Sequence, residues 1–525
     1  MSAPAPPGRI TEYTEIASRP YSCGGFVRGE TDLAEYLTAE CAKRIMMLDG
    51  AMGTMIQKEK YEEEDYRGER FAEYHMDIKG NNDLLSITQP DTIRTIYTKY
   101  LLAGSDIIET NTFSGTTIAQ ADYHMESLVD ELNIRSAELA REAVANVSAE
   151  DPSKPRFVAG AIGPTNRTGS ISPDVEDPGF RNVTFDELAD AYEQQTRALI
   201  KGGVDLLFVE TIFDTLNAKA ALFAIGQVLD EYEEATGRRM PVFVSGTIVD
   251  MSGRTLSGQT GEAFYVSIRH AKPFAVGLNC ALGAPQMKPF LQRLADEAEC
   301  KVLAYPNAGL PNQFGGYDDK PEDMARDVSD FATDGLVNFV GGCCGSTPPH
   351  IAAIARAVST MAPRVYVERA HHNDKMMHLS GLENLIVDKS RFAFLNVGER
   401  CNLSGSRMFK RLIKVRARRA PRRGPCRASR CSPMRRCDAL TRPSPFFVSF
   451  AFVCILLLSR FVSDGRLCRR DGGGAEASRG RRNGRGRERR RRYDRRRRGD
   501  GEVPQAGGDR ARYLESAVHD RLVQV

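Results

Sequence analysis

The chain has 525 residues, room for two or three domains, and 41% of them are hydrophobic, which is enough for a large core. Its net charge of +3 conceals two different segments, because residues 1–414 carry 42 Lys and Arg against 58 Asp and Glu, whereas residues 415–525 carry 30 Arg, no Lys and 11 acidic residues. The first eight residues lack a basic start followed by an apolar run, so we expect no signal peptide and a cytoplasmic location.

Short apolar runs rich in Val, Ile, Leu and Phe recur after a Pro-rich N-terminal extension, which we assign to residues 1–40. The eight runs are 45–50, 106–113, 157–163, 206–212, 242–248, 275–280, 302–307 and 338–343. The segments between them place apolar residues at helical spacing, for example at 92–103, 127–147, 185–201 and 321–333. Eight alternating strand and helix units predict an α/β fold, a (β/α)8 TIM barrel, which we place at residues 41–365.

Three cysteines stand at predicted strand ends: Cys280 ends the sixth run, and Cys343 and Cys344 end the eighth within a glycine-rich stretch. In a barrel these ends converge on one mouth, where the active sites of this fold lie. Three thiolates suit Zn²⁺ and leave its fourth position open, and we expect a substrate thiol there. The sequence has no Cys-x-x-Cys pair of the kind that closes a structural zinc site. The alternative is that the adjacent cysteines are small buried residues of a core strand.

The seven cysteines of residues 1–414 are odd in number and irregularly spaced. That pattern suits a reduced compartment better than a disulfide framework. Metal binding or catalysis is therefore the use that we expect for them.

Several motifs at the predicted strand ends make the segment recognisable. They are Met47-Leu48-Asp49-Gly50-Ala51-Met52-Gly53-Thr54, Asn81-Asn82-Asp83-Leu84-Leu85, Glu109-Thr110-Asn111-Thr112-Phe113, Gly160-Ala161-Ile162-Gly163-Pro164-Thr165-Asn166, Val209-Glu210-Thr211-Ile212-Phe213-Asp214-Thr215 and Gly341-Gly342-Cys343-Cys344-Gly345. Over about residues 45–358, the chain resembles the homocysteine-binding module of the cobalamin-dependent methionine synthase family. The resemblance implies a zinc-dependent homocysteine S-methyltransferase of methionine biosynthesis. In full-length members the methyl group passes from 5-methyltetrahydrofolate through methylcobalamin to homocysteine.

The resemblance also implies roles for individual residues. Cys280, Cys343 and Cys344 would hold the zinc ion and act in catalysis, while Asp49 and Glu210 would accept hydrogen bonds from the ammonium group of homocysteine. Asp49 could instead be a simple turn residue, and Glu210 a structural cap of its strand.

The carboxylate of homocysteine would be met by main-chain N–H groups around Gly50 to Gly53, those of Gly50 and Ala51 among them, and by that of Thr112. Asn279 is included among the expected substrate contacts. A role in orienting the cysteines suits Asn279 and Asn111 equally well.

The chain beyond the predicted barrel divides into three parts. Residues 366–390 form a polar linker, and residues 391–414 resemble a truncated start of the pterin-binding (folate) barrel of the same family, with Cys401 where the family usually has Thr. We expect the compact barrel to end near residue 365. We also expect a chain cut after Val358 to keep the melting temperature and the homocysteine affinity of the whole chain.

Residues 415–525 form an Arg-rich tail that we expect to be disordered. Codons for 494–503 and 518–525, shifted by one base, can encode stretches similar to the family's folate barrel, which predicts a retained intron and a frameshift. The alternative is an Arg-rich arm that neutralises RNA phosphates.

No Asp-x-His-x-x-Gly of the kind that ligates cobalamin in this family occurs in the sequence. The methylcobalamin-bearing module would therefore have to come from another chain, and this chain alone would lack the complete activity. We expect homocysteine as the substrate, no specific nucleic acid and no membrane. Two alternatives stay open: a fragment that binds zinc and homocysteine without turnover, and a related cobalamin-independent thiol methyltransferase.

Overall fold

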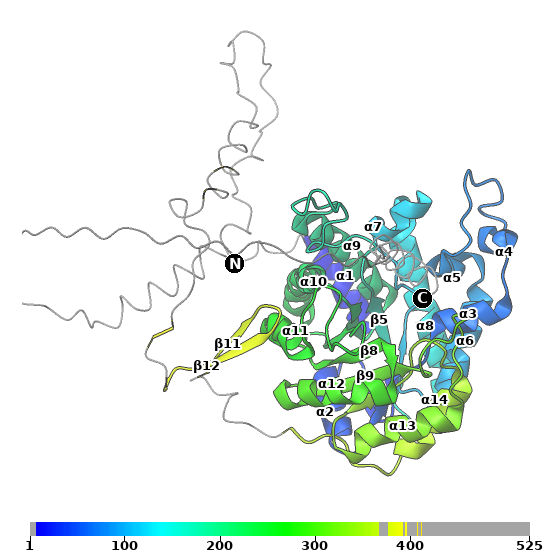
Figure 1. Cartoon of the computed structure of the whole chain (residues 1–525). Helices are drawn as coiled ribbons and strands as arrows, with labels where there is room; N and C mark the ends of the chain where they lie inside the picture. Colours follow the sequence, from blue (N-terminus) through cyan, green and yellow to red (C-terminus); the bar gives the residue numbers. More distant parts are fainter. Residues whose placement is uncertain (1–6, 367–375, 392–393, 396–406, 408–410, 412–525) are drawn as a thin grey trace, which may run out of the picture. The chain divides into compact units, whose positions relative to one another are not determined.

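The computed structural model of the chain describes residues 7–366, 376–391, 394–395, 407 and 411 (Figure 1). The expected truncated second barrel at 391–414 lies outside these residues apart from 391, 394–395, 407 and 411, and the expected tail at 415–525 lies outside them entirely. Within the described part of the chain, no helix combines the length and the apolar character that crossing a membrane would require.

Eight parallel strands form one sheet that curls into a nearly closed barrel (Figure 1). They are β3 (Met46–Met47), β4 (Ile107–Glu109), β5 (Phe157–Ile162), β6 (Leu206–Ile212), β7 (Val242–Gly246), β8 (Ala275–Gly283), β9 (Lys301–Asn307) and β10 (Phe339–Val340). Their order in the sheet is β3-β10-β9-β8-β7-β6-β5-β4. The predicted TIM-barrel fold is confirmed, and each strand coincides with one of the eight apolar runs.

Hydrogen bonds across the seam between β3 and β4 bring the first and last strands of the sheet together. The main-chain N–H of Asp106 donates to the carbonyl of Met47 at 2.8 Å, and the Asp106 carboxylate accepts the Met47 N–H at 2.8 Å. Farther along the strands, the Asp49 carboxylate accepts the Glu109 N–H at 3.0 Å. The seam therefore places Asp49 beside the end of β4.

A helix follows each barrel strand. The eight are α6 (Pro90–Ala103), α8 (Val129–Glu150), α9 (Phe185–Gly202), α10 (Thr215–Thr236), α11 (Gly261–Ile268), α12 (Ala284–Glu297), α13 (Pro321–Thr333) and α14 (Pro348–Val358). Each contacts the next, and α14 contacts α6, so the helices surround the sheet. Local signals fix their ends: Thr184 and Glu187 form a capping box at the start of α9, and Gly104 ends α6 with a φ of 118°.

Shorter elements fill the loops between the strands and these helices. They are α3 (Met52–Glu59), α4 (Glu63–Arg67), α5 (Leu85–Thr88), α7 (Thr117–Gln120) and the 3₁₀ turns η1 (Asn82–Leu84), η2 (Ala121–Tyr123), η3 (Glu126–Leu128) and η4 (Arg269–Ala271).

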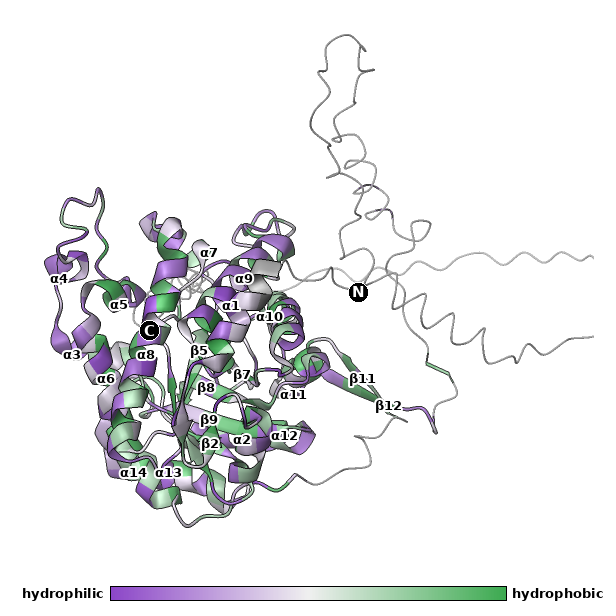
Figure 2. Ribbon diagram, turned by 180° about the vertical axis from the view of Figure 1, so that it is seen from behind, coloured by the Kyte–Doolittle hydropathy of each residue, from purple (hydrophilic) through white to green (hydrophobic). Residues whose placement is uncertain are grey.

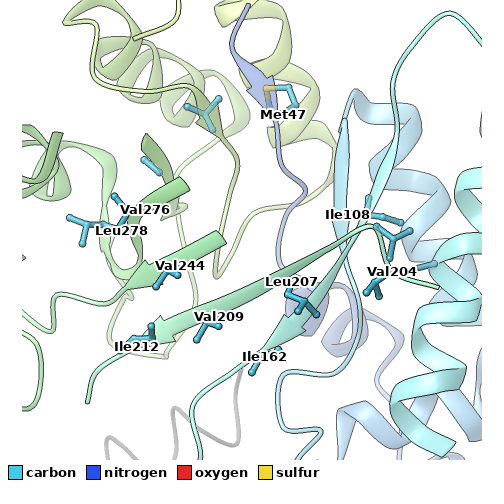
Figure 3. Close-up of a cluster of buried hydrophobic side chains, with 14 of the residues drawn as sticks. Met47, Ile108, Ile162, Val204, Leu207, Val209, Ile212, Val244, Val276 and Leu278 are labelled. Atoms are coloured by element: carbon cyan, nitrogen blue, oxygen red, sulfur yellow. The ribbon is translucent and has the colours of Figure 1, made fainter. Parts of the chain in front are cut away.

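The core consists of two layers because alternate strand residues point to opposite faces of the sheet. Outward-facing residues such as Ile162, Val209 and Val244 pack between the sheet and the helices (Figure 3). Inward-facing residues such as Phe208 and Phe243, with ring centroids 5.6 Å apart, fill the barrel. Figure 2 shows the apolar strands at the centre and polar residues on the outer faces of the helices.

The N-terminal segment packs on the barrel. It consists of α1 (Pro7–Ser18), a hairpin of β1 (Ser22–Cys23) and β2 (Phe26–Val27), and α2 (Leu33–Cys41). Phe26 stacks edge-on against Phe157, with ring centroids 5.2 Å apart, at the start of β5. The hairpin and α2 therefore cover the amino-terminal end of the barrel and leave the carboxyl-terminal mouth open.

Candidate active site

Three cysteine sulfurs converge at the carboxyl-terminal mouth of the barrel. The Sγ atoms of Cys280, Cys343 and Cys344 all lie within 4.8 Å of one another, and those of Cys280 and Cys344 are 3.7 Å apart. Thiolates bound to one tetrahedral zinc ion at about 2.3 Å would lie about 3.8 Å from each other. The spacing of the sulfurs therefore fits the ligand set of one zinc ion with a fourth position left for a substrate.

A β-bulge aims Cys280 at the other two thiols. The register of β8 against β9 shifts between Asn279 and Gly283, and Cys280 and Ala281 both adopt the left-handed region with φ of 57°. A bulge re-aims a side chain in this way where a regular strand would alternate it to the opposite face. Neither residue is a glycine, so the backbone at this point is strained.

The stretch from Gly341 to Gly345 leads from β10 to the other two thiols. Its backbone runs close to its neighbours, since a Cβ at Gly342 would lie 2.5 Å from the Ser346 hydroxyl oxygen. Gly345 has a φ of 82°, which L side chains rarely adopt. The glycines on both sides of Cys343 and Cys344 are thus needed for the turn that presents the two sulfurs.

Asn279 lies next to the cysteine cluster and is held by hydrogen bonds to neighbouring strands. It is fully buried, its Oδ1 accepts hydrogen bonds from the Ser245 hydroxyl at 2.8 Å and the Thr211 N–H at 3.2 Å, and its Nδ2 donates to the Thr211 hydroxyl at 2.8 Å. The same Nδ2 lies 3.9 Å from the Cys343 sulfur. Asn279 therefore contacts the cysteine cluster, and it is not among the residues that line the small cavity beside Cys343 and Cys344. An orienting role would act through these contacts, and it stays a prediction.

A cavity of about 80 Å³ lies beneath the thiols and is rich in carboxyl groups. Its walls include Asp49, Asp83, Glu109 and Glu210, together with Cys343 and Cys344. Among the described residues that line it, none is Lys, Arg or His. Buried carboxylates without a cation are costly, so this cavity is electrostatically suited to a cationic group.

Burial perturbs these carboxyl groups strongly. It raises the pKa of Asp49 to about 8, with the nearby Glu210 adding to the effect, and it raises the pKa of Asp83 to about 7. Burial raises the pKa of Glu210 to about 7 and that of Glu109 well above its usual range. Glu109 and Glu210 share a hydrogen bond, which raises the pKa of Glu109 and lowers that of Glu210. The stronger rise at Glu109 favours its protonation before that of Glu210.

The thiols are also shifted. A hydrogen bond with Cys280 is the main cause that raises the pKa values of Cys343 and Cys344, and burial adds to it. Three thiols this close become thiolates when a cation offsets their mutual repulsion. The three sulfurs therefore fit a metal ion in two ways: their spacing suits its ligands, and their ionised forms need a cation.

The start of α3 forms another wall of the acidic cavity. Met52, Gly53 and Thr54, the first three residues of the helix, all line it. The N–H groups of a first helical turn have no partner within the helix and carry the positive end of its dipole. This wall can therefore meet an anionic group opposite the carboxyls.

Above the thiols the barrel mouth opens into a larger cavity of about 970 Å³. Its walls include Phe113, Phe213, Val249, Leu256 and Tyr317, so they are largely apolar. Cys344, Thr54 and Phe113 line both cavities. The sulfur cluster consequently stands between an inner acidic cavity and an outer apolar mouth.

The model of the homocysteine S-methyltransferase family matches residues 46–358, more than half of the chain. The chain belongs to this family. The match covers all eight barrel strands, the three clustered cysteines and every residue that we predicted for the site.

Solved structures similar to this homocysteine S-methyltransferase family member include MmuM, the homocysteine methyltransferase from Escherichia coli. Its metallated form is 21% identical with a TM-score of 0.47, and the alignment covers 60% of this chain and 96% of that one. Its oxidised form is 21% identical with a TM-score of 0.46, covering 59% and 95%. The carboxyl transferase domain of pyruvate carboxylase from Rhizobium etli is 13% identical with a TM-score of 0.34, covering 68% and 54%.

The structure brings most of the predicted site residues of this family member together, but Thr112 stands apart. Asp49, Gly50, Ala51 and Glu210 line the acidic cavity. Thr112 is fully buried, its N–H donates to the Thr110 carbonyl at 2.9 Å, its hydroxyl donates to the Ala161 carbonyl at 2.7 Å, and it is not among the lining residues.

Sequence reasoning missed Asp83 and assigned no role to Glu109. Asp83 lies in the 3₁₀ turn η1, away from any strand, and its carboxylate accepts the Ser114 N–H at 2.6 Å. Glu109 was visible as the end of a strand. The repeated appearance of Asp and Glu in the recognised motifs was the one signal that could have pointed to both.

Proposed function

We propose that this chain is the zinc-dependent homocysteine S-methyltransferase module of a methionine synthase. The observation that carries the proposal is the position of the three thiols between the acidic cavity and the open mouth. An amino acid with a side-chain thiol fits this arrangement. Its cationic amine suits the acidic cavity, and its sulfur is a soft ligand for a metal held by the thiols. A zinc ion held by Cys280, Cys343 and Cys344 would keep the substrate sulfur as a thiolate near neutral pH.

The inner cavity supports recognition of the ammonium group. Asp49 and Glu210 supply the negative charge once the ammonium group stabilises their ionised forms, and Glu109 shares a hydrogen bond with Glu210. Binding of the ammonium group stabilises the ionised carboxylates, so it offsets the cost of burying them. Because the cavity has no cation of its own among the described residues, the substrate supplies the missing charge.

The start of α3 supports recognition of the substrate carboxylate. Met52 and Gly53 line the cavity together with Gly50 and Ala51, and the N–H groups of a first helical turn have no partner within the helix. With both ends of the amino acid held, the sulfur would face the mouth.

The methyl donor that we propose is methylcobalamin, carried by a module outside the described chain. A mouth of about 970 Å³ with apolar walls leaves room for a large donor above Cys344. In the transfer the substrate thiolate attacks the methyl carbon, a carbon–sulfur bond forms, and the electron pair of the broken bond stays with the donor. The product is methionine. We also infer a cytoplasmic location, which rests on the sequence alone.

The test is an assay of the purified full chain, loaded with zinc, with homocysteine and methylcobalamin. We expect one zinc per chain and formation of methionine detected by mass spectrometry. Replacing Cys343→Ala should abolish both zinc retention and homocysteine binding, because two remaining thiolates no longer form the site. The matched control is Cys300→Ala, which changes a half-buried cysteine outside the cluster and should keep both. One zinc per chain after loss of all three clustered cysteines would contradict the proposal.

A second candidate function is a cobalamin-independent thiol methyltransferase. The family that matches the chain is defined by the homocysteine acceptor, and the mouth would also admit a smaller donor. Methionine formed from S-methylmethionine, a methylsulfonium compound, but not from methylcobalamin would favour this candidate. Zinc and homocysteine binding without methionine from either donor would leave a binding protein without turnover.

A further inference from the structure

A two-stranded hairpin follows the segment that the family model matches. Strands β11 (Met376–Ser380) and β12 (Asn384–Asp388) pair in antiparallel fashion, and the hairpin lies beside α11 (Figure 1). The Thr260 N–H, at the start of α11, donates to the Leu382 carbonyl at 3.0 Å. Arg254 also forms an ion pair with Glu383 in the turn of the hairpin. The hairpin is therefore bonded to the loop between β7 and α11, residues 247–260.

Gln259 joins the hairpin to the barrel. Only 9% of this residue is exposed, its Nε2 donates to the Gly381 carbonyl at 2.8 Å and to the Ser267 hydroxyl at 3.2 Å, and its Oε1 accepts a hydrogen bond from the Thr215 hydroxyl. The hydroxyl of Ser380 contacts that of Ser267 at 2.8 Å. One buried amide thus connects the tip of the hairpin, α11 and the start of α10.

The other side of the same loop is a wall of the barrel mouth. Val249 and Leu256 line the outer cavity, and the Ser257 N–H donates to the carbonyl of Phe213, which lines it as well. The loop is therefore held between the hairpin on one side and the cavity on the other. Any displacement of the hairpin would be transmitted to this wall through Gln259 and Thr260.

We propose that the hairpin β11–β12 positions the loop 247–260 and so sets the shape of the mouth through which the methyl donor approaches the thiols. Gln259 is the positioning residue. The hairpin lies outside the segment that the family model matches. The proposal rests on the proposed function as far as the donor is concerned, whereas the fixing of the loop does not depend on it.

The experiment compares the full chain with two variants. Ser380→Leu removes the hydroxyl contacts of the hairpin with α11, and Gln259→Leu removes the amide that bonds to Gly381, Ser267 and Thr215. Ser390→Leu, at an exposed position two residues beyond the end of β12, is the matched control. Hydrogen exchange of the Thr260 and Ser257 amides should become about tenfold faster in the first two variants, because their bonds then open locally. The control should exchange at the parental rate.

Kinetics with methylcobalamin supply the functional measurement. We expect the KM for methylcobalamin to rise about threefold or more in Ser380→Leu and Gln259→Leu with a smaller change in kcat, the pattern of lost donor binding. Zinc content and the Kd for homocysteine should stay at the parental values. Parental exchange rates at both amides in Ser380→Leu and Gln259→Leu would overturn the proposal, as would an unchanged KM. A parent that binds no zinc or homocysteine would refute the proposed function instead, and the exchange rates alone would then decide whether the hairpin holds the loop.

Discussion

Glu109 and Glu210 are chemically alike and share a hydrogen bond, yet their surroundings give them different charge states. Burial and the neighbouring Glu210 and Asp49 raise the pKa of Glu109 well above its usual range, whereas burial raises that of Glu210 only to about 7. A glutamine can replace a protonated donor, but as an acceptor it lacks the negative charge that strengthens the bond of a carboxylate to an ammonium group. The two isosteric substitutions should therefore differ in effect.

We expect Glu210→Gln to weaken homocysteine binding by about 1.5 to 3 kcal/mol, the worth of a hydrogen bond to a charged group, and to leave zinc in place. Glu109→Gln should weaken it far less, because the amide still donates to Glu210. Calorimetric titration of both zinc-loaded variants makes the comparison. A homocysteine analogue without the amino group should bind Glu210→Gln and the parent equally well; a clear difference for that analogue would argue against the ammonium role.

Residue patterns identified the thiols and part of the acidic cavity from the sequence, because strand ends of a barrel meet at one mouth. Cys280, Cys343 and Cys344 are each visible as soft ligands at such ends. Asp83 was not visible, since it reaches the cavity from a 3₁₀ turn. Thr112 was expected, by resemblance, to offer its main-chain N–H to the substrate, but that N–H donates to the Thr110 carbonyl at 2.9 Å. A place at a strand end brings a residue to the mouth and does not fix which of its polar groups face the cavity.

At the scale of elements, the eight strands could be predicted because parallel strands buried on both faces read as continuous apolar runs. The bulges in β6 and β8 could not be predicted. Thr211 and Cys280 adopt φ values of 54° and 57° without being glycines, so the sequence carries no local signal for them. These two bulges shape the backbone at Glu210 and Cys280, and hence much of the geometry of the site.

Helix α3 allows a test of carboxylate recognition by a backbone group. Met52 is its first residue, a position where proline is well accommodated because that N–H has no partner within the helix. The preceding Ala51 is extended, with φ of −63° and ψ of 111°, as a residue before proline prefers. Met52→Pro should therefore keep the fold and remove one N–H donor from the cavity.

We expect Met52→Pro to lower homocysteine affinity by about 1 kcal/mol, or about fivefold in Kd, with zinc content unchanged. Met52→Ala, which loses the side chain but keeps the N–H, is the control. The discriminating ligand is 3-aminopropane-1-thiol, which is homocysteine without its carboxylate. It should bind Met52→Pro and Met52→Ala equally, and a further loss specific to Met52→Pro with this ligand would rule out the carboxylate contact.

At the scale of the whole molecule, the buried carboxyls make stability depend on pH. Burial raises the pKa of Asp83 to about 7, so the folded protein keeps a proton that the unfolded chain releases above its own pKa of about 4. The free energy of unfolding should therefore fall as pH rises from about 4 to about 7 and level off above that. Asp83→Asn should make the melting temperature of the substrate-free protein less dependent on pH in this window. Asp77→Asn, at a side chain that is 94% exposed, should keep the parental slope.

The contacts of Arg364 bear on how much of the chain the stable barrel needs. The family match and helix α14 both end at residue 358, and from the pattern alone a chain cut after Val358 should keep full stability. Arg364 nevertheless reaches back into the barrel. Its N–H donates to the Val337 carbonyl at 2.9 Å, and its guanidinium donates to the carbonyls of Ala295 and Ala298 at 2.8 and 2.9 Å, at the carboxyl end of α12.

A cut after Val358 removes this arginine and the hairpin together. The carbonyls at the end of α12 would then lose a cationic partner, and Gln259 would lose its acceptor at Gly381. We therefore expect a chain cut after Val358 to melt several degrees below one cut after Arg391. Arg364→Ala in the chain cut after Arg391 should lower the melting temperature by only part of that difference. The loss of the hairpin accounts for the rest. Equal melting temperatures for the two truncated chains, measured by calorimetry at one pH, would show that residues 359–391 contribute nothing to the stability of the barrel.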